Sequence, residues 1–168
     1  MLDFRHIKKE RIAAKEVFIE KMRQIIIARK DLHMTPGKLA AQCAHASIAF
    51  ITNQILNAQK TENEGEEKYN INIELSKDCV DGWICGIFTK TICQAKNRNQ
   101  LLKAKKIAED LGLVEGQDFF LIKDSCLTEL EPEEIDGNGK GHTLTCIGFV
   151  PLPDEIAHKI SKKFHLYM

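Results

Sequence analysis

Three polar side chains within one helical stretch are spaced so that they could act together. Lys38, Gln42 and His45 are four and three residues apart, and on a helix with 100° per residue all three project within about 60° of one another. Lys38 also falls in the first helical turn, where free backbone N–H groups attract anions. The pattern is typical of a site for a phosphate or a developing oxyanion. The alternative is ordinary, because polar residues at this spacing often form the solvent face of a helix.

A second polar cluster follows the apolar segment 119–124, which is expected to form a buried strand. It consists of Asp124, Thr128 and Glu129. In α/β proteins, sites usually form where strands end, and residues 24–32 form another such strand, directly before the first cluster. The two clusters would share one edge of the sheet if these strands run parallel. A carboxylate, a hydroxyl and a nearby cation could orient water and stabilise negative charge during acyl transfer, although Asp and Thr are also common in turns.

Hydrophobic periodicity predicts the elements that position these clusters. The expected helices cover residues 4–22, 36–59, 73–83, 97–113 and a segment after Pro153, and the expected strands cover 24–32, 88–95, 119–124 and 143–150. Thr35 and Pro36 are typical of a helix start. Either Asn97 or Asn99 is expected to cap the helix that Gly112 ends. Polar acidic connectors are expected over 60–72 and 131–142.

The order of these elements predicts the fold class. Strands separated by helices favour a right-handed βαβ core, whereas the last two strands need only a loop and can pair antiparallel. We therefore expect a single three-layer α/β/α domain with a small mixed β-sheet of about four strands and helices on both faces.

Composition limits the class of protein. The 168 residues are 43% hydrophobic, which suits one folded domain and excludes wholesale disorder. No apolar stretch approaches the roughly 20 residues that span a bilayer, and the charged N-terminus is not typical of a secretory signal. The six cysteines contain no C-x-x-C pair. They are expected to be free thiols used as small core residues, which indicates the cytoplasm and no metal site.

The first cluster belongs to a longer run, IIIARKDLHMTPGKLAAQCAHASIAF, that resembles the second type of peptidyl-tRNA hydrolase, found in archaea and eukaryotes. The family motif G-K-[aliphatic]-A-A-Q-x-x-H-A is matched at Gly37, Lys38, Ala40, Ala41, Gln42, His45 and Ala46. The second family block, D-x-G-x-T-Q, reads Asp124-Ser-Cys-Leu-Thr128-Glu129 here. Cys126 thus replaces the usual glycine, and Glu129 replaces the usual glutamine. The resemblance covers residues 23–168, so residues 1–22 are expected to form an N-terminal helical extension.

The resemblance implies hydrolysis of the ester bond between a peptidyl group and tRNA, which recycles tRNA from prematurely released peptidyl-tRNA. The implied catalytic residues are Lys38, Asp124, Thr128 and His45, and the implied substrate-binding residues are Gln42, Gly37, Glu129 and Lys30. Asp124 would orient or deprotonate water, and Lys38 would stabilise the oxyanion, whereas His45 could instead bridge helix and sheet. No cofactor and no metal are expected, and a homodimer is left open. The alternative is a non-catalytic tRNA-, RNA- or protein-binding domain in which Lys38 anchors a phosphate.

The zero net charge hides a segregation along the chain. Residues 1–30 carry nine Lys or Arg against four acids, and residues 90–106 carry six and no acid. Separated charge of this kind predicts one basic face that binds tRNA phosphates and a binding strength that falls steeply with salt.

Overall fold

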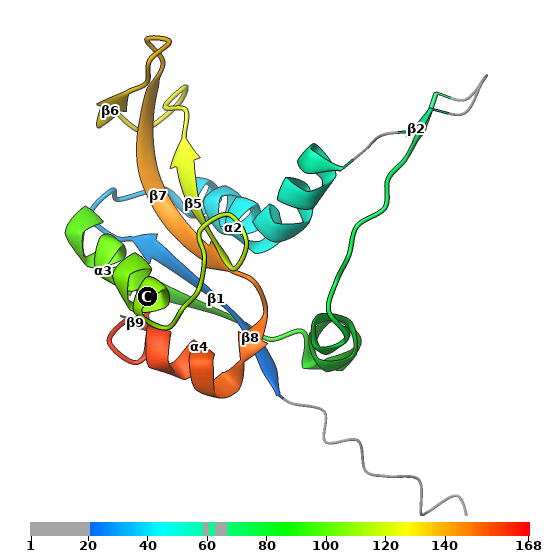
Figure 1. The fold of residues 1–168 in the computed structure, drawn as a ribbon. Helices are drawn as coiled ribbons and strands as arrows, with labels where there is room; N and C mark the ends of the chain where they lie inside the picture. The colour runs from blue at the N-terminus through cyan, green and yellow to red at the C-terminus, as the bar shows by residue number, and fades with distance from the viewer. Residues whose placement is uncertain (1–20, 59–60, 63–66) are drawn as a thin grey trace, which may run out of the picture.

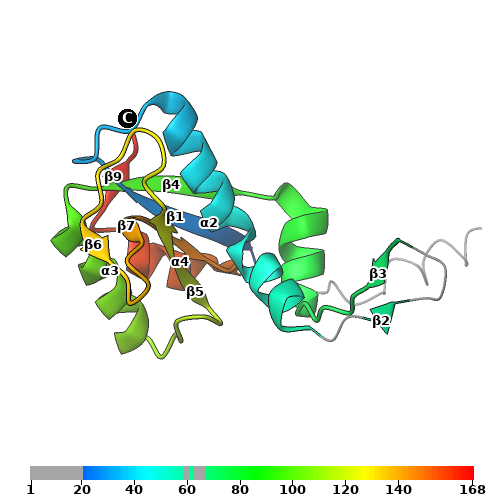
Figure 2. The same ribbon diagram turned by 90° about the horizontal axis from the view of Figure 1, so that it is seen from above.

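The computed structural model describes residues 21–58, 61–62 and 67–168 (Figure 1). The longer strands are β1 (Met22–Arg29), β4 (Lys90–Ala95), β5 (Phe119–Asp124) and β7 (Gly141–Phe149). The helices are α2 (Pro36–Asn57), α3 (Arg98–Asp110), α4 (Asp154–Ser161) and a wider helical segment, η1 (Asp78–Ile87). Helix α2 covers one face of the sheet, and α3 and α4 cover the other (Figure 2). The expected three-layer α/β/α architecture is confirmed.

The sheet contains more strands than expected. Its order is β5-β7-β1-β4-β9, with β6 beside β7 and β8 beside β1, which gives seven strands in the part of the chain that the structure describes. The additional strands have two residues each: β6 (Glu134–Ile135), β8 (Leu152–Pro153) and β9 (His165–Leu166). The expectation of about four strands therefore holds only for the long ones. Two further short strands, β2 (Thr61–Glu62) and β3 (Tyr69–Asn70), pair with each other away from the main sheet (Figure 1).

Strand directions decide where functional side chains can meet. Strands β1 and β4 are parallel neighbours, and β7 runs antiparallel to both β1 and β5. Since β7 separates β1 from β5, those two strands point the same way, and Ile147 of β7 lies opposite Ile27 on one side and Leu121 on the other. The ends of β1 and β5 therefore lie at one edge of the sheet, as a shared site requires.

The core explains why β1 is an uninterrupted apolar run. Ile25 and Ile27 pack with residues of α3 and α4, whereas Ile26 and Ala28 pack with residues of α2. A strand covered on both faces needs apolar side chains at every position rather than at alternate ones.

Helix α2 lies unusually close to β7. A Cβ atom added to Gly148 would lie 2.4 Å from the carbonyl oxygen of Ala46. Only glycine allows this approach, because any side chain would force the helix away from the strand.

Several element boundaries differ from the sequence prediction. Strand β1 ends at Arg29 rather than residue 32, since a turn that includes His33 at φ 46° follows it. The helix expected over 73–83 begins at Asp78 and ends at Ile87. In its first turn, the Cys79 N–H donates a hydrogen bond to the Ser76 hydroxyl oxygen. The acidic connector 131–142 is partly a hairpin that contains β6, which pairs with the start of β7.

Other sequence predictions are confirmed or fall outside the described residues. Asn97, not Asn99, caps α3, and Gly112 ends it at φ 82°. The helix predicted over 4–22 lies almost wholly outside the described residues, and Met22 already belongs to β1. All six cysteines are free; Cys43, Cys79, Cys93 and Cys146 are buried as expected, but Cys126 is half-buried and Cys85 is exposed. No helix in the described residues is long and apolar enough to cross a membrane.

Candidate active site

The start of α2 holds Lys38 at the edge where β1 and β5 end. Thr35 caps the helix, because its hydroxyl oxygen accepts a hydrogen bond from the Lys38 N–H at 3.3 Å, and Pro36 fills the first helical position. Both features are typical of a helix N-terminus, because the cap accepts from a free backbone N–H and proline has no N–H that needs a partner. The Lys38 side chain is thereby directed from the first turn toward the end of β5.

Lys38 meets both polar residues of the second cluster. Its Nζ lies 2.7 Å from Asp124 Oδ2 and donates to the Thr128 hydroxyl oxygen at 3.0 Å. The Asp124 side chain is 9% exposed and that of Lys38 is 15% exposed, so the ion pair is largely withdrawn from water. Opposite charges attract each other more strongly in such an environment than in water. The two clusters that the sequence analysis singled out form a single site.

Gln42 ties this pair to the sheet. Its Nε2 donates to Asp124 Oδ2 at 2.8 Å, and its Oε1 accepts from the Thr145 hydroxyl at 2.6 Å. Gln42, Asp124 and Thr145 are all buried. Gln42 therefore orients the carboxylate from inside the protein, and its expected role in substrate binding stays a prediction.

The chain after β5 completes the shell of Asp124. Cys126 has a φ of 54°, a left-handed conformation that glycine adopts without strain, and glycine is the residue usual at this position of the family motif. This turn directs the Cys126 N–H to Asp124 Oδ1 at 2.9 Å. The site thus keeps the glycine-type backbone with a cysteine side chain.

A count of donors and acceptors shows what the site can still bind. The Asp124 carboxylate offers about four acceptor positions, of which Lys38, Gln42 and the Cys126 N–H use three. Lys38 has three ammonium hydrogens and uses two on described residues. One acceptor on Asp124 and one donor on Lys38 therefore remain for a water molecule and a carbonyl oxygen.

Glu129 holds the start of α2 rather than an open position. Its two carboxylate oxygens accept from the Thr35 N–H at 2.9 Å and the Thr35 hydroxyl at 2.8 Å. The contact fixes the loop that carries Thr128 against the helix that carries Lys38. Glu129 is thus placed to position the site, and its expected role in substrate binding stays a prediction.

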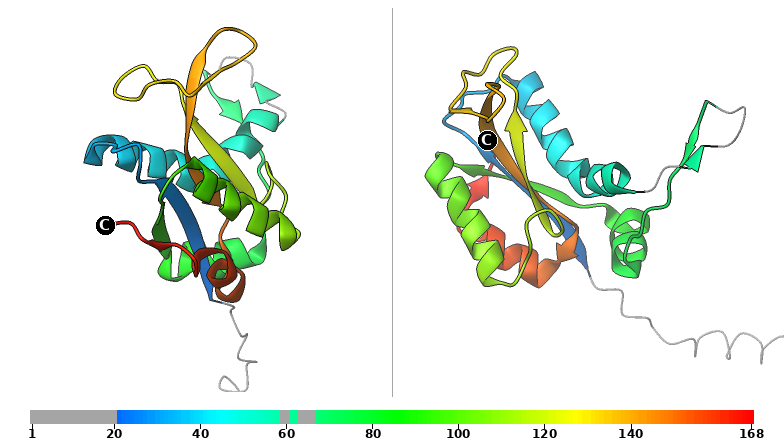
Figure 3. Two further views of the ribbon diagram at one scale, coloured as in Figure 1. Left: turned by 90° about the vertical axis from the view of Figure 1, so that its left-hand side faces the viewer. Right: turned by 45° about the horizontal axis from the view of Figure 1, so that its top comes forward.

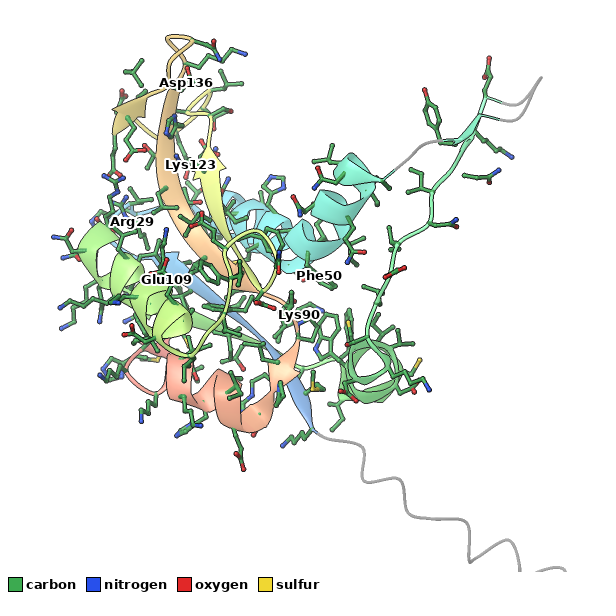
Figure 4. The ribbon with its side chains drawn as sticks, in the orientation of Figure 1. Arg29, Phe50, Lys90, Glu109, Lys123 and Asp136 are labelled. Atoms are coloured by element: carbon green, nitrogen blue, oxygen red, sulfur yellow. The ribbon has the colours of Figure 1, made fainter. Side chains whose placement is uncertain are left out.

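Arg29 connects several segments at this edge of the sheet, and the sequence analysis missed it. Its guanidinium is 3% exposed and donates five hydrogen bonds: two to Asp31, two to Glu133 and one to the Leu144 carbonyl. All five guanidinium N–H groups are thereby used. Figure 4 shows Arg29 between the end of β1 and the first turn of α3. It joins the turn after β1 to the segment that leads into the β6–β7 hairpin.

These contacts shift the pKa values of the charged partners. Burial alone would lower the pKa of Arg29, but hydrogen bonds and attraction from Glu133 and Asp31 outweigh it and raise the pKa above its usual range. The hydrogen bond from Arg29 is in turn the main reason that the pKa of Glu133 is lowered. A charged residue at the end of a buried strand was the available sequence signal for this network.

The remaining predicted residues lie near the site without joining its contacts. Gly37 is exposed at the start of α2, and its N–H makes no hydrogen bond within the described residues. Lys30 is exposed and donates to the Met168 carbonyl oxygen at 2.9 Å. His45 is exposed on α2, about 10 Å along the helix from Lys38. Its exposure argues against a bridge between helix and sheet, and its catalytic role stays a prediction.

Metal binding was not expected at this site. In the described part of the chain, no three His, Cys, Asp or Glu side chains form a group that could hold a metal ion. Metal independence nevertheless stays a prediction.

Comparison with known proteins identifies the family. Residues 22–167 match the family described as "Peptidyl-tRNA hydrolase PTH2". The chain belongs to this family. A peptidyl-tRNA hydrolase of Thermococcus sibiricus is 30% identical over 146 residues, which cover 87% of this chain and 98% of that protein. Peptidyl-tRNA hydrolases of Methanopyrus kandleri and Thermococcus onnurineus are 30% and 28% identical, each over 83% of this chain and 92% of the relative. The PTH2 match thus includes every residue of the candidate site.

Proposed function

We propose that this protein hydrolyses the ester bond that joins a peptide to tRNA and so returns the tRNA for reuse. The observation that carries the proposal is the ion pair between Lys38 and Asp124, 2.7 Å apart, inside a chain of the PTH2 family. An ester has a fair leaving group, so the reaction needs an activated water molecule and stabilisation of negative charge.

In the proposed mechanism, water binds at the free acceptor position of Asp124. As the water oxygen attacks the ester carbonyl carbon, its proton passes to the carboxylate. The third ammonium hydrogen of Lys38 and the Gly37 N–H stabilise the oxyanion that forms. The carbon–oxygen bond to the ribose then breaks, and the ribose oxygen takes the proton from Asp124. The products are a peptide carboxylic acid, which ionises in water, and free tRNA.

Other residues position this machinery. Gln42 holds the carboxylate, and Thr145 fixes the orientation of the Gln42 amide. Thr128 accepts from Lys38, which leaves its hydroxyl hydrogen for the water or for a ribose hydroxyl. Lys30 is proposed to contact the tRNA at the rim of the site, and His45 to assist proton transfer from the exposed side of α2.

The test is release of the acyl group from N-acetyl-aminoacyl-tRNA without added metal. We expect Lys38→Ala and Asp124→Asn to lower turnover at least ~100-fold while the fold stays intact. Lys77→Ala, at an exposed lysine before η1, serves as the matched control and should keep the full rate. Near-normal rates in both site variants would overturn the assignment, and tRNA binding without release would favour the non-catalytic RNA-binding domain.

Three wider predictions accompany this function. The protein is proposed to work in the cytoplasm, where its six free thiols would stay reduced. The helical extension predicted over residues 1–22 is proposed only for the residues before β1, because Met22 already belongs to the hydrolase domain. A homodimer also remains a prediction, which sedimentation of the purified protein would test.

A further inference from the structure

A lysine-lined hollow lies on the face of the sheet opposite α2. Helices α3 and α4 pack side by side there (Figure 3). A hollow of about 400 Å³ between them is lined by Lys103, Lys106, Ile107, Lys163 and the buried Phe164, together with Gln100. A second hollow of about 370 Å³ shares Ile107 and Lys163 with the first. The two hollows are therefore adjacent, and together they are called the α3–α4 groove below.

The groove carries a strong excess of positive charge. Asp110 is the acidic residue that lines it, and its carboxylate is paired with Lys106 Nζ at 2.8 Å. No ion pair within the described residues engages the other lysines of the groove, which are Lys103, Lys159, Lys162 and Lys163. These four lysines are exposed, and in the described part of the chain none of them forms an ion pair.

This location refines the basic face expected from the sequence. Residues 1–30 and the segment 90–106 were expected to supply the positive surface, but half of the cations of 90–106 are paired with acids. These pairs are Arg98 with Glu134, Lys105 with Glu115 and Lys106 with Asp110. The unpaired Lys103 of this segment lines the same hollows as Lys159, Lys162 and Lys163, which belong to a basic stretch that the sequence analysis did not single out.

The groove starts close to the edge that holds Lys38 and Asp124. Helix α3 begins directly after β4, and the Lys30 N–H donates to the Ala95 carbonyl at 2.8 Å, so the ends of β1 and β4 lie together. Lys103 is five residues into α3, about 7.5 Å along its axis. Exposed Lys30 and Lys96 directly follow β1 and β4 at this edge. One anionic ligand can therefore extend from the catalytic edge to the groove.

We propose that the α3–α4 groove binds the phosphate backbone of the tRNA body while the acylated end of the same tRNA occupies the catalytic site. The proposal rests on the proposed function, because it takes peptidyl-tRNA as the ligand. Lysines act as point charges on flexible stems, which suits phosphates and not base edges. Phe164, the aromatic side chain of the groove, is only 8% exposed and offers little surface for base stacking. The groove would hence recognise RNA by charge and shape.

The experiment measures binding of deacylated tRNA by fluorescence anisotropy at several salt concentrations. Lys103→Gln combined with Lys163→Gln removes two charges of the groove. The matched control, Lys68→Gln combined with Lys77→Gln, removes two exposed lysines between α2 and η1. We expect the groove variant to raise the Kd of tRNA at least ~10-fold and to reduce the slope of log Kd against log salt by about 2. The control should leave both quantities unchanged.

Charge-preserving and small-anion measurements separate the causes. The double Lys→Arg variant at the same two positions should restore tRNA binding, which excludes a folding defect as the reason for the loss. An unchanged Kd and slope in the Gln variant, or an equal loss in the control variant, would overturn the proposal. Saturable binding of inorganic phosphate in the groove, with tRNA binding unaffected by the Gln variant, would assign a small-anion site instead. Preferential binding to vesicles of anionic phospholipid would assign a membrane surface.

A kinetic arm separates this proposal from the proposed function. With N-acetyl-aminoacyl-tRNA, the groove variant should raise KM about as much as Kd and leave kcat unchanged. With N-acetyl-aminoacyl-adenosine, which lacks the tRNA body, the groove variant and the unchanged protein should react at equal rates. If neither substrate were cleaved by the unchanged protein, the proposed function would fail, whereas the anisotropy measurement would still decide the groove.

Discussion

Cys126 has a backbone conformation that glycine adopts more easily, and this predicts how a glycine at position 126 would change stability. Its φ of 54° lies in the left-handed region, and its N–H donates to Asp124. Replacement by glycine keeps that N–H and removes the steric cost of the Cβ atom. We therefore expect Cys126→Gly to stabilise the protein, although substitution by glycine usually does the opposite.

The size of the effect follows from two opposing terms. A residue other than glycine in the left-handed region destabilises the folded state by about 1–2 kcal/mol. A new glycine has the opposite effect on the balance, because it raises the conformational entropy of the unfolded chain and so lowers the free energy of unfolding by about 0.4–1 kcal/mol. The net gain is about 0.5–1 kcal/mol, which raises Tm by about 1–4 °C in a domain of this length. The cysteine side chain adds little, since its Sγ makes only a 3.5 Å contact with the Asp124 carbonyl.

Thermal and urea unfolding under reducing conditions measure this gain. Cys126→Ala keeps the strain and loses only the sulfur, so it should change the free energy of unfolding by less than about 0.5 kcal/mol. Cys85→Gly is the matched control, because Cys85 is exposed in η1 and has no positive φ. It should destabilise by about 0.5–1 kcal/mol. Equal destabilisation by both glycine variants would refute the strain at Cys126.

Two further predictions concern packing and pH. Gly148→Ala should lower the free energy of unfolding in urea by about 1–3 kcal/mol and slow peptide release, because its Cβ would lie 2.4 Å from the Ala46 carbonyl oxygen. Gly137→Ala, with no atom within 4 Å of its Cβ, should change neither. Glu133→Gln should make the free energy of unfolding fall less steeply as the pH is lowered, because the folded-state pKa of Glu133 is lowered by Arg29. A lowered pKa contributes stability above the unfolded value of about 4.3 and loses it as pH falls through the folded value.

Each of these has a result that would contradict it. An unchanged unfolding free energy for Gly148→Ala would mean that α2 can leave β7 without loss of packing. Parallel stability profiles of Glu133→Gln and the unchanged protein between pH 3 and pH 7 would mean that the Arg29 contact does not persist in solution.

Local features of the structure were predictable from the sequence. Thr35 and Pro36 start α2, Asn97 caps α3 and Gly112 ends it, and β5 has the predicted bounds. Each of these depends on residues within one turn of the chain. The lysine, carboxylate and hydroxyl of the site were found because their residue types carry chemistry and because the run around Lys38 resembles a known family.

Long-range contacts were not predictable in this way. Arg29 binds Glu133, 104 positions further along the chain, and Gln42 meets Thr145 across 103 positions. The two-residue strands of the main sheet, β6, β8 and β9, are too short to show a periodicity, and each pairs with a longer strand beside it. The start of η1 is different, because Ser76 is a recognisable cap that the sequence analysis passed over.

The position of β7 means that the candidate site is completed late along the chain. Strand β7 (Gly141–Phe149) lies between the strands that end near Lys38 and Asp124, and it also supplies Thr145. Until residues 141–149 have been made, β1 and β5 have no shared neighbour and the carboxylate has no fixed position beside the lysine. A growing copy of this chain is itself a peptide esterified to tRNA. Under the proposed function, a growing copy that still lacks β7 therefore has no complete site with which to cut the bond to its own tRNA.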